Sequence, residues 1–214
     1  MSRASDLCTS CVTSAWTLSW AGRGARVTGV DFSAEALAIA RQLGEQVGVE
    51  AQFVHSDVLQ AAEKLDSTFD IVFLSKGVMM WIQDLSAWAG VCARLLKPGG
   101  IFYLLDYHPL ANALTQTADG LALHRSYFHD PEPAVIVADG SYAVPDAVLE
   151  HKESREWTHT LGDIVTALVG AGIRIEFLHE FPATSAGRMP IPQLDRGAAR
   201  HELPAMYSVR GIRT

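Results

Sequence analysis

The fold of this chain is decided by the stretch Val27-Thr28-Gly29-Val30-Asp31-Phe32-Ser33 and by the segment that follows it, 34–47. The apolar run predicts a buried strand that ends at Asp31, and Ser33 is a typical helix N-cap. From 34 to 47 apolar residues recur at helical spacing, and Gly48 supplies a stop. A strand that passes directly into a helix is the first half of a βαβ unit, so this stretch predicts a parallel sheet.

The alternation of strands and helices continues on the C-terminal side of this stretch. We expect strands at 51–55, 69–74 and 101–105, helices near 59–65 and over 84–96, and a turn at Lys97-Pro98-Gly99-Gly100. The 69–74 run is continuously apolar, which predicts a central strand covered on both faces. Later segments predict a helix over 161–171 and strands over 173–181 and 205–212, which can pair as an antiparallel hairpin at the sheet edge. We therefore expect one α/β domain over 1–214 with a loop-rich insertion at about 115–155.

Composition narrows the class of protein. The chain has 214 residues, 49% hydrophobic and 19% charged, which is enough to bury one sizeable core. A net charge of -7 without a block of basic residues argues against nucleic acid as the partner. Apolar stretches are broken well before the ~20 residues that cross a bilayer, so no membrane segment is expected. The same charge pattern fits a small or neutral substrate better. Three cysteines do not form a disulfide framework, which favours a reducing cytoplasm.

Cys8 and Cys11 form a CxxC motif, which can bind metal or shuttle disulfides. No second CxxC and no group of histidines completes a ligand set around it. The simpler interpretation is that both are small residues on a strand, and we expect no metal site.

Acidic residues close two neighbouring predicted strands. Asp31 ends the strand at 27–31, and Asp57 follows the strand at 51–55. Open parallel sheets bind ligands at the carboxyl ends of their strands. Asp31 can accept hydrogen bonds from both hydroxyls of a ribose, whereas Asp57 can accept from the exocyclic amine of adenine while the Val58 N–H serves a ring nitrogen. Taken alone, Asp31 is better explained as a surface acid beside a helix N-terminus; together, the two acids predict an adenosine site.

The stretch 23–109 resembles the class I S-adenosylmethionine-dependent methyltransferase family. The resemblance is carried, in order, by Gly24-Ala25-Arg26-Val27-Thr28-Gly29-Val30-Asp31-Phe32-Ser33, Ser56-Asp57-Val58, Phe69-Asp70-Ile71-Val72 and Leu95-Leu96-Lys97-Pro98-Gly99-Gly100. Two later pieces, Asp106-Tyr107-His108-Pro109-Leu110 and Glu156-Trp157-Thr158-His159, resemble a bacterial branch that acts on small molecules.

The resemblance implies a Rossmann-like sheet, mostly parallel with an antiparallel C-terminal hairpin, and S-adenosylmethionine as the cofactor. It also implies the cofactor-binding residues. Asp31 and Phe32 would hold the ribose side, and Asp57 with Val58 would bind the adenine. The methyl-donor end would be lined by Ser75, Lys76 and Gly77.

The chain departs from the family pattern at its start. Family members begin their first strand with an acid and continue into a Gly-rich loop, whose backbone N–H groups approach the cofactor closely. The stretch Leu7–Trp16 contains neither glycine nor acid, and almost no residues precede it to form the helices that family members carry there. We therefore expect an N-terminally truncated class I fold with a weakened hold on the methionine end of the cofactor and lowered activity.

Two histidines are candidate catalytic bases, which methyl transfer requires only if the acceptor is protonated at working pH. His108 lies just beyond the predicted strand at 101–105, and its alternative role is a structural histidine that bonds a nearby backbone carbonyl. His159 precedes the helix at 161–171. Its alternative is packing beside Trp157, with Thr158 or Thr160 capping the helix.

Three functions stay open. The first is an S-adenosylmethionine-dependent methyltransferase acting on an unidentified small molecule, and the second is a non-catalytic protein that keeps the methyltransferase fold. The third is an NAD-dependent oxidoreductase, because an acid after the second strand also suits the ribose of NAD. That third function needs a GxGxxG motif before Asp31, which the sequence lacks.

Overall fold

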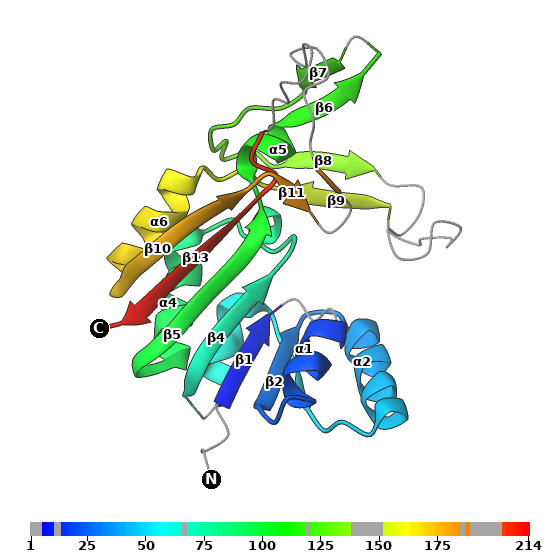
Figure 1. The fold of residues 1–214 in the computed structure, drawn as a ribbon, viewed down its shortest axis with the longest axis vertical. Coiled ribbons are helices and arrows are strands. Elements are labelled where there is room, and N and C mark those ends of the chain that lie inside the picture. Colours follow the sequence, from blue (N-terminus) through cyan, green and yellow to red (C-terminus); the bar gives the residue numbers. More distant parts are fainter. Residues whose placement is uncertain are drawn as a thin grey trace.

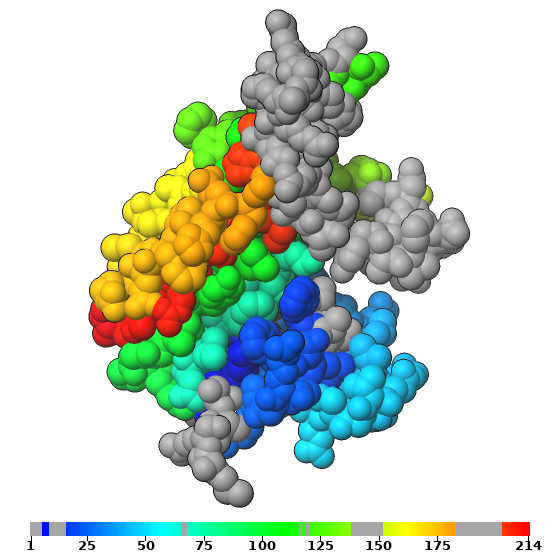
Figure 2. Space-filling model, viewed as in Figure 1, coloured from blue at the N-terminus to red at the C-terminus, as the bar shows by residue number. Residues whose placement is uncertain are grey.

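The computed structural model describes residues 6–10, 14–65, 68–118, 120–137, 152–184, 187–188 and 203–214. Figure 1 shows a central sheet with helices on both of its faces and two small hairpins beyond one end of its strands. In Figure 2, α6 and β10 form one flank of the molecule, in yellow and orange, and α1 and α2 form the opposite flank, in blue and cyan.

The main sheet has seven strands in the order β10-β13-β5-β4-β1-β2-β3. Neighbours from β5 to β3 are parallel, whereas β13 is antiparallel to both β5 and β10. The sheet is therefore mostly parallel with an antiparallel C-terminal pair, as expected from the sequence. Its strands are β1 (Asp6–Ser10), β2 (Arg26–Asp31), β3 (Gln52–His55), β4 (Phe69–Ser75), β5 (Leu96–Tyr107), β10 (Ile173–Phe181) and β13 (Met206–Arg213).

The helices cover both faces of this sheet. Helix α1 packs on α2 and β2, whereas α4 packs on α6 and on the opposite face. The α-helices are α1 (Ser14–Ala21), α2 (Ala34–Val47), α3 (Ala61–Lys64), α4 (Leu85–Leu95), α5 (Pro109–Ala113) and α6 (Leu161–Gly170), and the short 3-10 turns are η1 (Val58–Gln60) and η2 (Met79–Trp81). None of the helices described here combines the length and the apolar character that crossing a bilayer requires.

Strand β4 shows why the sheet is buried on both sides. Alternate residues of a strand point to opposite faces. Val72 and Leu74 belong to the large core beneath α4 and α6, which includes Trp88 and Phe102. Phe73 points the other way, where its ring contacts Trp20 of α1 at a centroid distance of 5.7 Å. The predicted central strand covered on both faces is thus confirmed.

The predicted helix over 34–47 is confirmed with the same bounds. Ser33 Oγ accepts a hydrogen bond from the N–H of Ala36, and Gly48 ends the helix in the left-handed region at φ 68°. Glycine adopts that conformation without steric cost, which explains the stop.

The expected turn at Lys97–Gly100 lies inside the range of β5, which begins at Leu96 and not at Ile101, and Gly99 has a positive φ of 75° there. Lys97 Nζ donates to Asp70 at 2.8 Å and to Asp6 at 3.1 Å, which ties this stretch to the sheet. A Cβ on Gly100 would lie 3.2 Å from the Asp70 carbonyl oxygen. Residues 97–100 have no register partner on β4 or β13, and the β4–β5 register shifts between Phe69 and Ile71, so this stretch interrupts the pairing within the range of β5.

The insertion contains short antiparallel hairpins instead of loops alone. They are β6 (Leu114–Thr117) with β7 (Gly120–Leu123), and β8 (Ala134–Val137) with β9 (Glu153–Glu156). A further pair, β11 (Ala183–Thr184) with β12 (Gly187–Arg188), follows β10. The first two hairpins lie beyond the carboxyl ends of β4 and β5, where a parallel sheet binds its ligands (Figure 1).

Candidate functional site

The two predicted acids lie at adjacent strand ends. Asp31 ends β2 and Asp57 follows β3, and the strands are joined there because Ser56 N–H donates to the Asp31 carbonyl at 2.9 Å. His55 Nε2 also hydrogen-bonds the Phe32 carbonyl at 2.7 Å. The structure therefore brings Asp31, Phe32 and Asp57 to one edge of the sheet, with the Phe32 side chain 68% exposed beside the two acids.

Each acid also organises its own turn. Asp31 Oδ1 accepts from the Ser33 N–H at 2.8 Å, and Asp57 Oδ1 accepts from the Leu59 N–H at 2.8 Å. Asp57 thus caps η1, whose first residue is Val58. An ionised carboxylate has two oxygens and about four acceptor positions, so a single cap bond is compatible with ligand binding.

The predicted methyl-donor end, Ser75 to Gly77, follows β4 at the same edge. Ser75 is buried at the end of the strand. Lys76 and Gly77 both have positive φ angles, 44° and 81°. A positive φ is uncommon for a residue with a side chain, so this turn needs support from its surroundings.

That support comes from Asp106, which sequence reasoning did not assign. Its buried carboxylate accepts four backbone hydrogen bonds, from Gly77 at 2.5 Å, Val78 at 3.0 Å, Met79 at 2.9 Å and its own neighbour Tyr107 at 2.7 Å. Burial raises the pKa of Asp106, and the four N–H donors act in the opposite direction. The signal that could have found it is its place as a third acid at a strand end, after β5.

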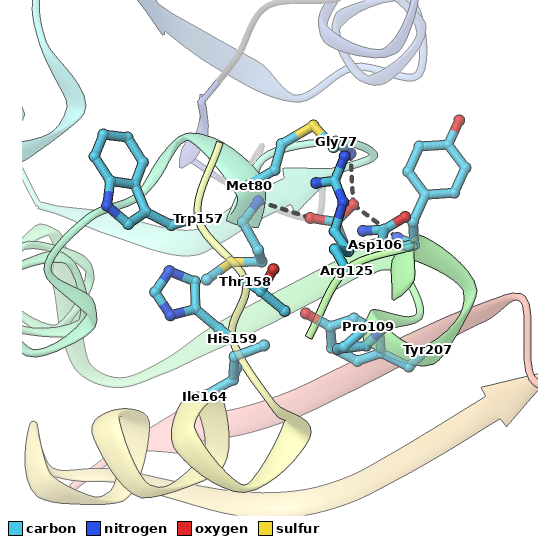
Figure 3. Close-up of a pocket in the computed structure, with 13 residues that line it drawn as sticks. Gly77, Met80, Asp106, Pro109, Arg125, Trp157, Thr158, His159, Ile164 and Tyr207 are labelled. Atoms are coloured by element: carbon cyan, nitrogen blue, oxygen red, sulfur yellow. Dashed lines mark hydrogen bonds between the residues drawn. The ribbon is translucent and has the colours of Figure 1, made fainter. Parts of the chain in front are cut away.

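A small cavity lies between this turn and the segment that precedes α6. It encloses about 20 Å³, and its wall includes Gly77, Met80, Asp106, Arg125, His159 and Tyr207. Figure 3 shows the Asp106 carboxylate with its backbone donors on one side and the 157–159 segment on the other. Arg125 donates to Glu156 at 3.0 Å, and both side chains are largely buried. This ion pair joins the end of the β6–β7 hairpin to β9.

His159 lines this cavity. Its Nε2 donates to the Ile82 carbonyl, so Nδ1 is the unprotonated nitrogen of the neutral ring. The ring stacks on His129 at a centroid distance of 4.9 Å. Burial lowers the pKa of His159, which keeps the ring neutral. The predicted cap of the next helix is Thr160, whose Oγ1 accepts from the Asp163 N–H at 3.0 Å in a capping box.

His108 does not line the cavity, although it is buried nearby. Its Nδ1 accepts from the Leu110 N–H at 3.1 Å, and its Nε2 donates to Glu180 at 2.8 Å. Burial lowers the pKa of His108, against the influence of Glu180. Both ring nitrogens thus have partners within the protein. Neither partner is a backbone carbonyl, which the structural alternative for His108 predicts. Catalytic roles for His108 and His159 stay predictions.

Strand β1 supplies the centre of the sheet, between β2 and β4. It begins at Asp6, just before the stretch that lacks acids, and Asp6 pairs with Arg26 and Lys97. Cys8 is buried in this strand, and burial raises the pKa of its thiol to about 12, so the reactive thiolate is suppressed. Cys11 and the expected position of a Gly-rich loop, 11–13, lie outside the described residues.

A family model described as a methyltransferase domain matches residues 7–104. This match covers β1 to β4, most of β5, both acids and the Ser75–Gly77 turn. Over these residues the chain is similar to the class I, S-adenosylmethionine-dependent methyltransferases. The mostly parallel sheet with its antiparallel C-terminal pair is the sheet that the resemblance implied.

Two curated relatives match the methyltransferase domain. The chain is 36% identical over 95 residues to a ubiquinone biosynthesis O-methyltransferase of Sodalis glossinidius, covering 44% of this chain and 38% of the relative. It is 37% identical over 86 residues to a demethylmenaquinone methyltransferase of Thermus thermophilus, covering 40% and 38%. The aligned part of the chain therefore spans less than half of either relative.

The likeness in three dimensions extends further along the chain. A solved S-adenosylmethionine-dependent methyltransferase from Mesorhizobium loti superposes with a TM-score of 0.66 at 21% identity, covering 98% of this chain and 91% of that one. The methyltransferase fold thus includes the C-terminal strands β10 and β13.

Proposed function

We propose that this protein transfers a methyl group from S-adenosylmethionine to a small-molecule acceptor. The observation that carries the proposal is the pair Asp31 and Asp57 at adjacent parallel strand ends, joined by the Ser56 N–H to Asp31 carbonyl bond of 2.9 Å. Two acceptor groups one βα unit apart match an adenosine, which presents ribose hydroxyls and an exocyclic amine as donors.

The residues at this edge fit the cofactor. Asp31 binds the ribose, with Phe32 beside it, and Asp57 and the Val58 N–H bind the adenine. Ser75, Lys76 and Gly77 line the far end, in a turn that the bonds from Gly77, Val78 and Met79 to Asp106 fix in place. When bound, S-adenosylmethionine supplies an electrophilic methyl group on a sulfonium.

The cavity beside Gly77 receives one polar group of the acceptor. Methyl transfer is an in-line displacement, so the protein aligns the acceptor and excludes water. The β6–β7 and β8–β9 hairpins provide that enclosure, and the Arg125–Glu156 ion pair fastens one to the other. His159 takes a proton from the acceptor at Nδ1 where the acceptor carries one, and His108, which is buried outside the cavity wall, stays the second candidate base.

The names of the relatives suggest an acceptor class. One is named for ubiquinone biosynthesis and O-methylation, the other for demethylmenaquinone. We infer a ring-containing small molecule of comparable chemistry, and a reducing cytoplasmic location, since Cys8 and Cys92 are buried free thiols.

Isothermal titration of the purified protein with S-adenosylmethionine and S-adenosylhomocysteine tests the proposal. We expect heat of binding from both, and methyl transfer to a hydroxylated quinone detected by mass spectrometry. Absence of heat from both compounds at high micromolar protein would instead support the non-catalytic alternative.

A further inference from the structure

The hydroxyl group of Tyr207 is buried without a hydrogen-bond partner among the described residues. Tyr207 lies on β13 and its side chain is 0% exposed. Leaving a buried hydroxyl unpaired costs about 1–3 kcal/mol, and native proteins rarely do so without a reason. An unpaired donor of this kind indicates a ligand where it also lines a cavity, as Tyr207 does.

The position of Tyr207 is fixed by its neighbours. On β13 it is paired in register with Asp106 of β5, and the ring of His108 packs edge-on against it at 6.2 Å. Tyr207 belongs to the wall of the cavity described above. Figure 3 shows the ring alongside Pro109 with its hydroxyl end turned toward Thr158 and His159, across the cavity.

Three charged or titratable groups of the wall are already bonded. Asp106 accepts four backbone N–H groups, Arg125 is paired with Glu156, and His159 donates to Ile82. Burial, with Asp106 nearby, raises the pKa of Tyr207 well above its ordinary value, so the hydroxyl stays protonated and can donate. A second unpaired buried donor, Trp157 Nε1, belongs to a residue of the same wall.

The size and lining of the cavity limit what reaches Tyr207. A volume of about 20 Å³ accommodates one oxygen-sized group, since a single water needs about 10–15 Å³. The apolar part of the wall includes Met79, Met80, Pro109 and Ile164. Thioethers pack favourably against aromatic rings. A flat ring therefore fits against the methionines while one of its oxygens enters the cavity.

We propose that Tyr207 donates a hydrogen bond to an oxygen of the methyl acceptor, and that this acceptor is an unsaturated ring bearing a carbonyl or hydroxyl group. The inference rests on the proposed function, because it assigns the acceptor side of the same site. Tyr207 is then a substrate-binding residue that selects oxygen-bearing rings and fixes their orientation toward the methyl donor.

The test uses the hydroxynaphthoquinone lawsone as the probe, titrated into the full-length protein with and without S-adenosylhomocysteine. Its visible absorption band reports hydrogen bonding to its oxygens. We expect wild-type protein to bind lawsone with a shift of that band. Tyr207→Phe should bind about tenfold more weakly and without the shift, because one hydrogen bond is lost.

Two controls show whether a loss of lawsone binding is due to the Tyr207 hydroxyl itself. Tyr103→Phe removes a hydroxyl from a tyrosine that stacks on Phe73 in the other core, and should bind lawsone like wild type. Tyr207→Phe should keep its melting temperature and its affinity for S-adenosylhomocysteine, since the hydroxyl has no partner within the described protein.

Equal lawsone affinity in wild type and Tyr207→Phe would overturn the inference, as would a wild type that binds S-adenosylhomocysteine but not lawsone. A wild type that binds no S-adenosylhomocysteine would overturn the proposed function instead. In that case the titrations without S-adenosylhomocysteine still decide the role of Tyr207.

Discussion

The carboxylate of Asp106 accepts a hydrogen bond from the backbone N–H of Met79 at 2.9 Å, although 27 residues separate the two in the chain. Together with the bonds from Gly77 and Val78, this contact fixes the turn after β4 against the end of β5. This turn is the one predicted to line the methyl-donor end of the cofactor, so the buried side chain of Asp106 fixes the backbone there.

Asp106→Asn should therefore destabilise the protein strongly. The amide has one acceptor oxygen instead of two, and its NH2 group would face backbone donors. We expect the free energy of unfolding to fall by about 2–5 kcal/mol, as buried N–H groups lose their acceptors. Urea denaturation measures it. Asp84→Asn is the control, because Asp84 caps α4 from an exposed position and asparagine caps equally well; equal losses in the two variants would contradict the role of Asp106.

Asp31→Asn and Asp57→Asn should each weaken binding of S-adenosylhomocysteine. Asparagine keeps one oxygen for the bonds from Ser33 and Leu59, so the melting temperature should change little. The charge-assisted bonds to the ligand are lost, which predicts a loss of ~1–3 kcal/mol in binding free energy by calorimetry. An exposed residue of the insertion, Asp130, serves as the control through Asp130→Asn. A variant with unchanged affinity would place that acid outside the site.

The stability of the protein should decrease as the pH falls below about 6.5. Burial lowers the folded-state pKa of both His108 and His159. Glu180 opposes this shift at His108; at His159, His129 adds to it and Asp163 opposes it. Below that pH the unfolded chain binds more protons than the folded protein, so protonation favours unfolding. Urea midpoints at a series of pH values check the slope. His108→Gln combined with His159→Gln should flatten it, and an unchanged slope would show that other groups control the acid response.

Replacing Gly211 and Gly90 with alanine should change the stability of the protein in opposite directions. A Cβ on Gly211 would lie 2.5 Å from the Ile173 side chain and 3.0 Å from the Arg174 carbonyl oxygen, so Gly211→Ala should separate β10 from β13 at a cost of about 1–3 kcal/mol. Gly90, inside α4, has nothing within 4 Å of such a Cβ. Gly90→Ala should stabilise the helix by about 0.5–1 kcal/mol. Thermal denaturation distinguishes the two, and a shift of the same sign in both would contradict the packing described here.

Much of the fold could be predicted from local chemistry. The bounds of α2 follow from Ser33 and Gly48, because caps and a left-handed glycine act within one turn of the chain. The apolar run of β4 indicates a strand buried on both faces. The start of β5 could not be predicted in this way, since Lys97 is held by Asp6 and Asp70, which are distant in sequence.

The candidate site, too, could be predicted from the sequence only in part. Acids at the ends of predicted parallel strands must share an edge of the sheet, so the nearness of Asp31 and Asp57 follows from the sequence. The partners of His108 and His159 do not follow from it. Glu180 reaches His108 from another strand, and the Ile82 carbonyl reaches His159 from the segment before α4.

The sequence by itself determined the parallel sheet, its helices and the edge where a nucleotide-like ligand would bind, because periodicity, caps and strand ends are local properties of the chain. Only the tertiary structure decided that Asp106 shapes the Ser75–Gly77 turn and that the buried Tyr207 hydroxyl has no hydrogen-bond partner among the residues that the structure describes. Both depend on pairing between β4, β5 and β13, and a side chain's surroundings exist only once those strands are assembled.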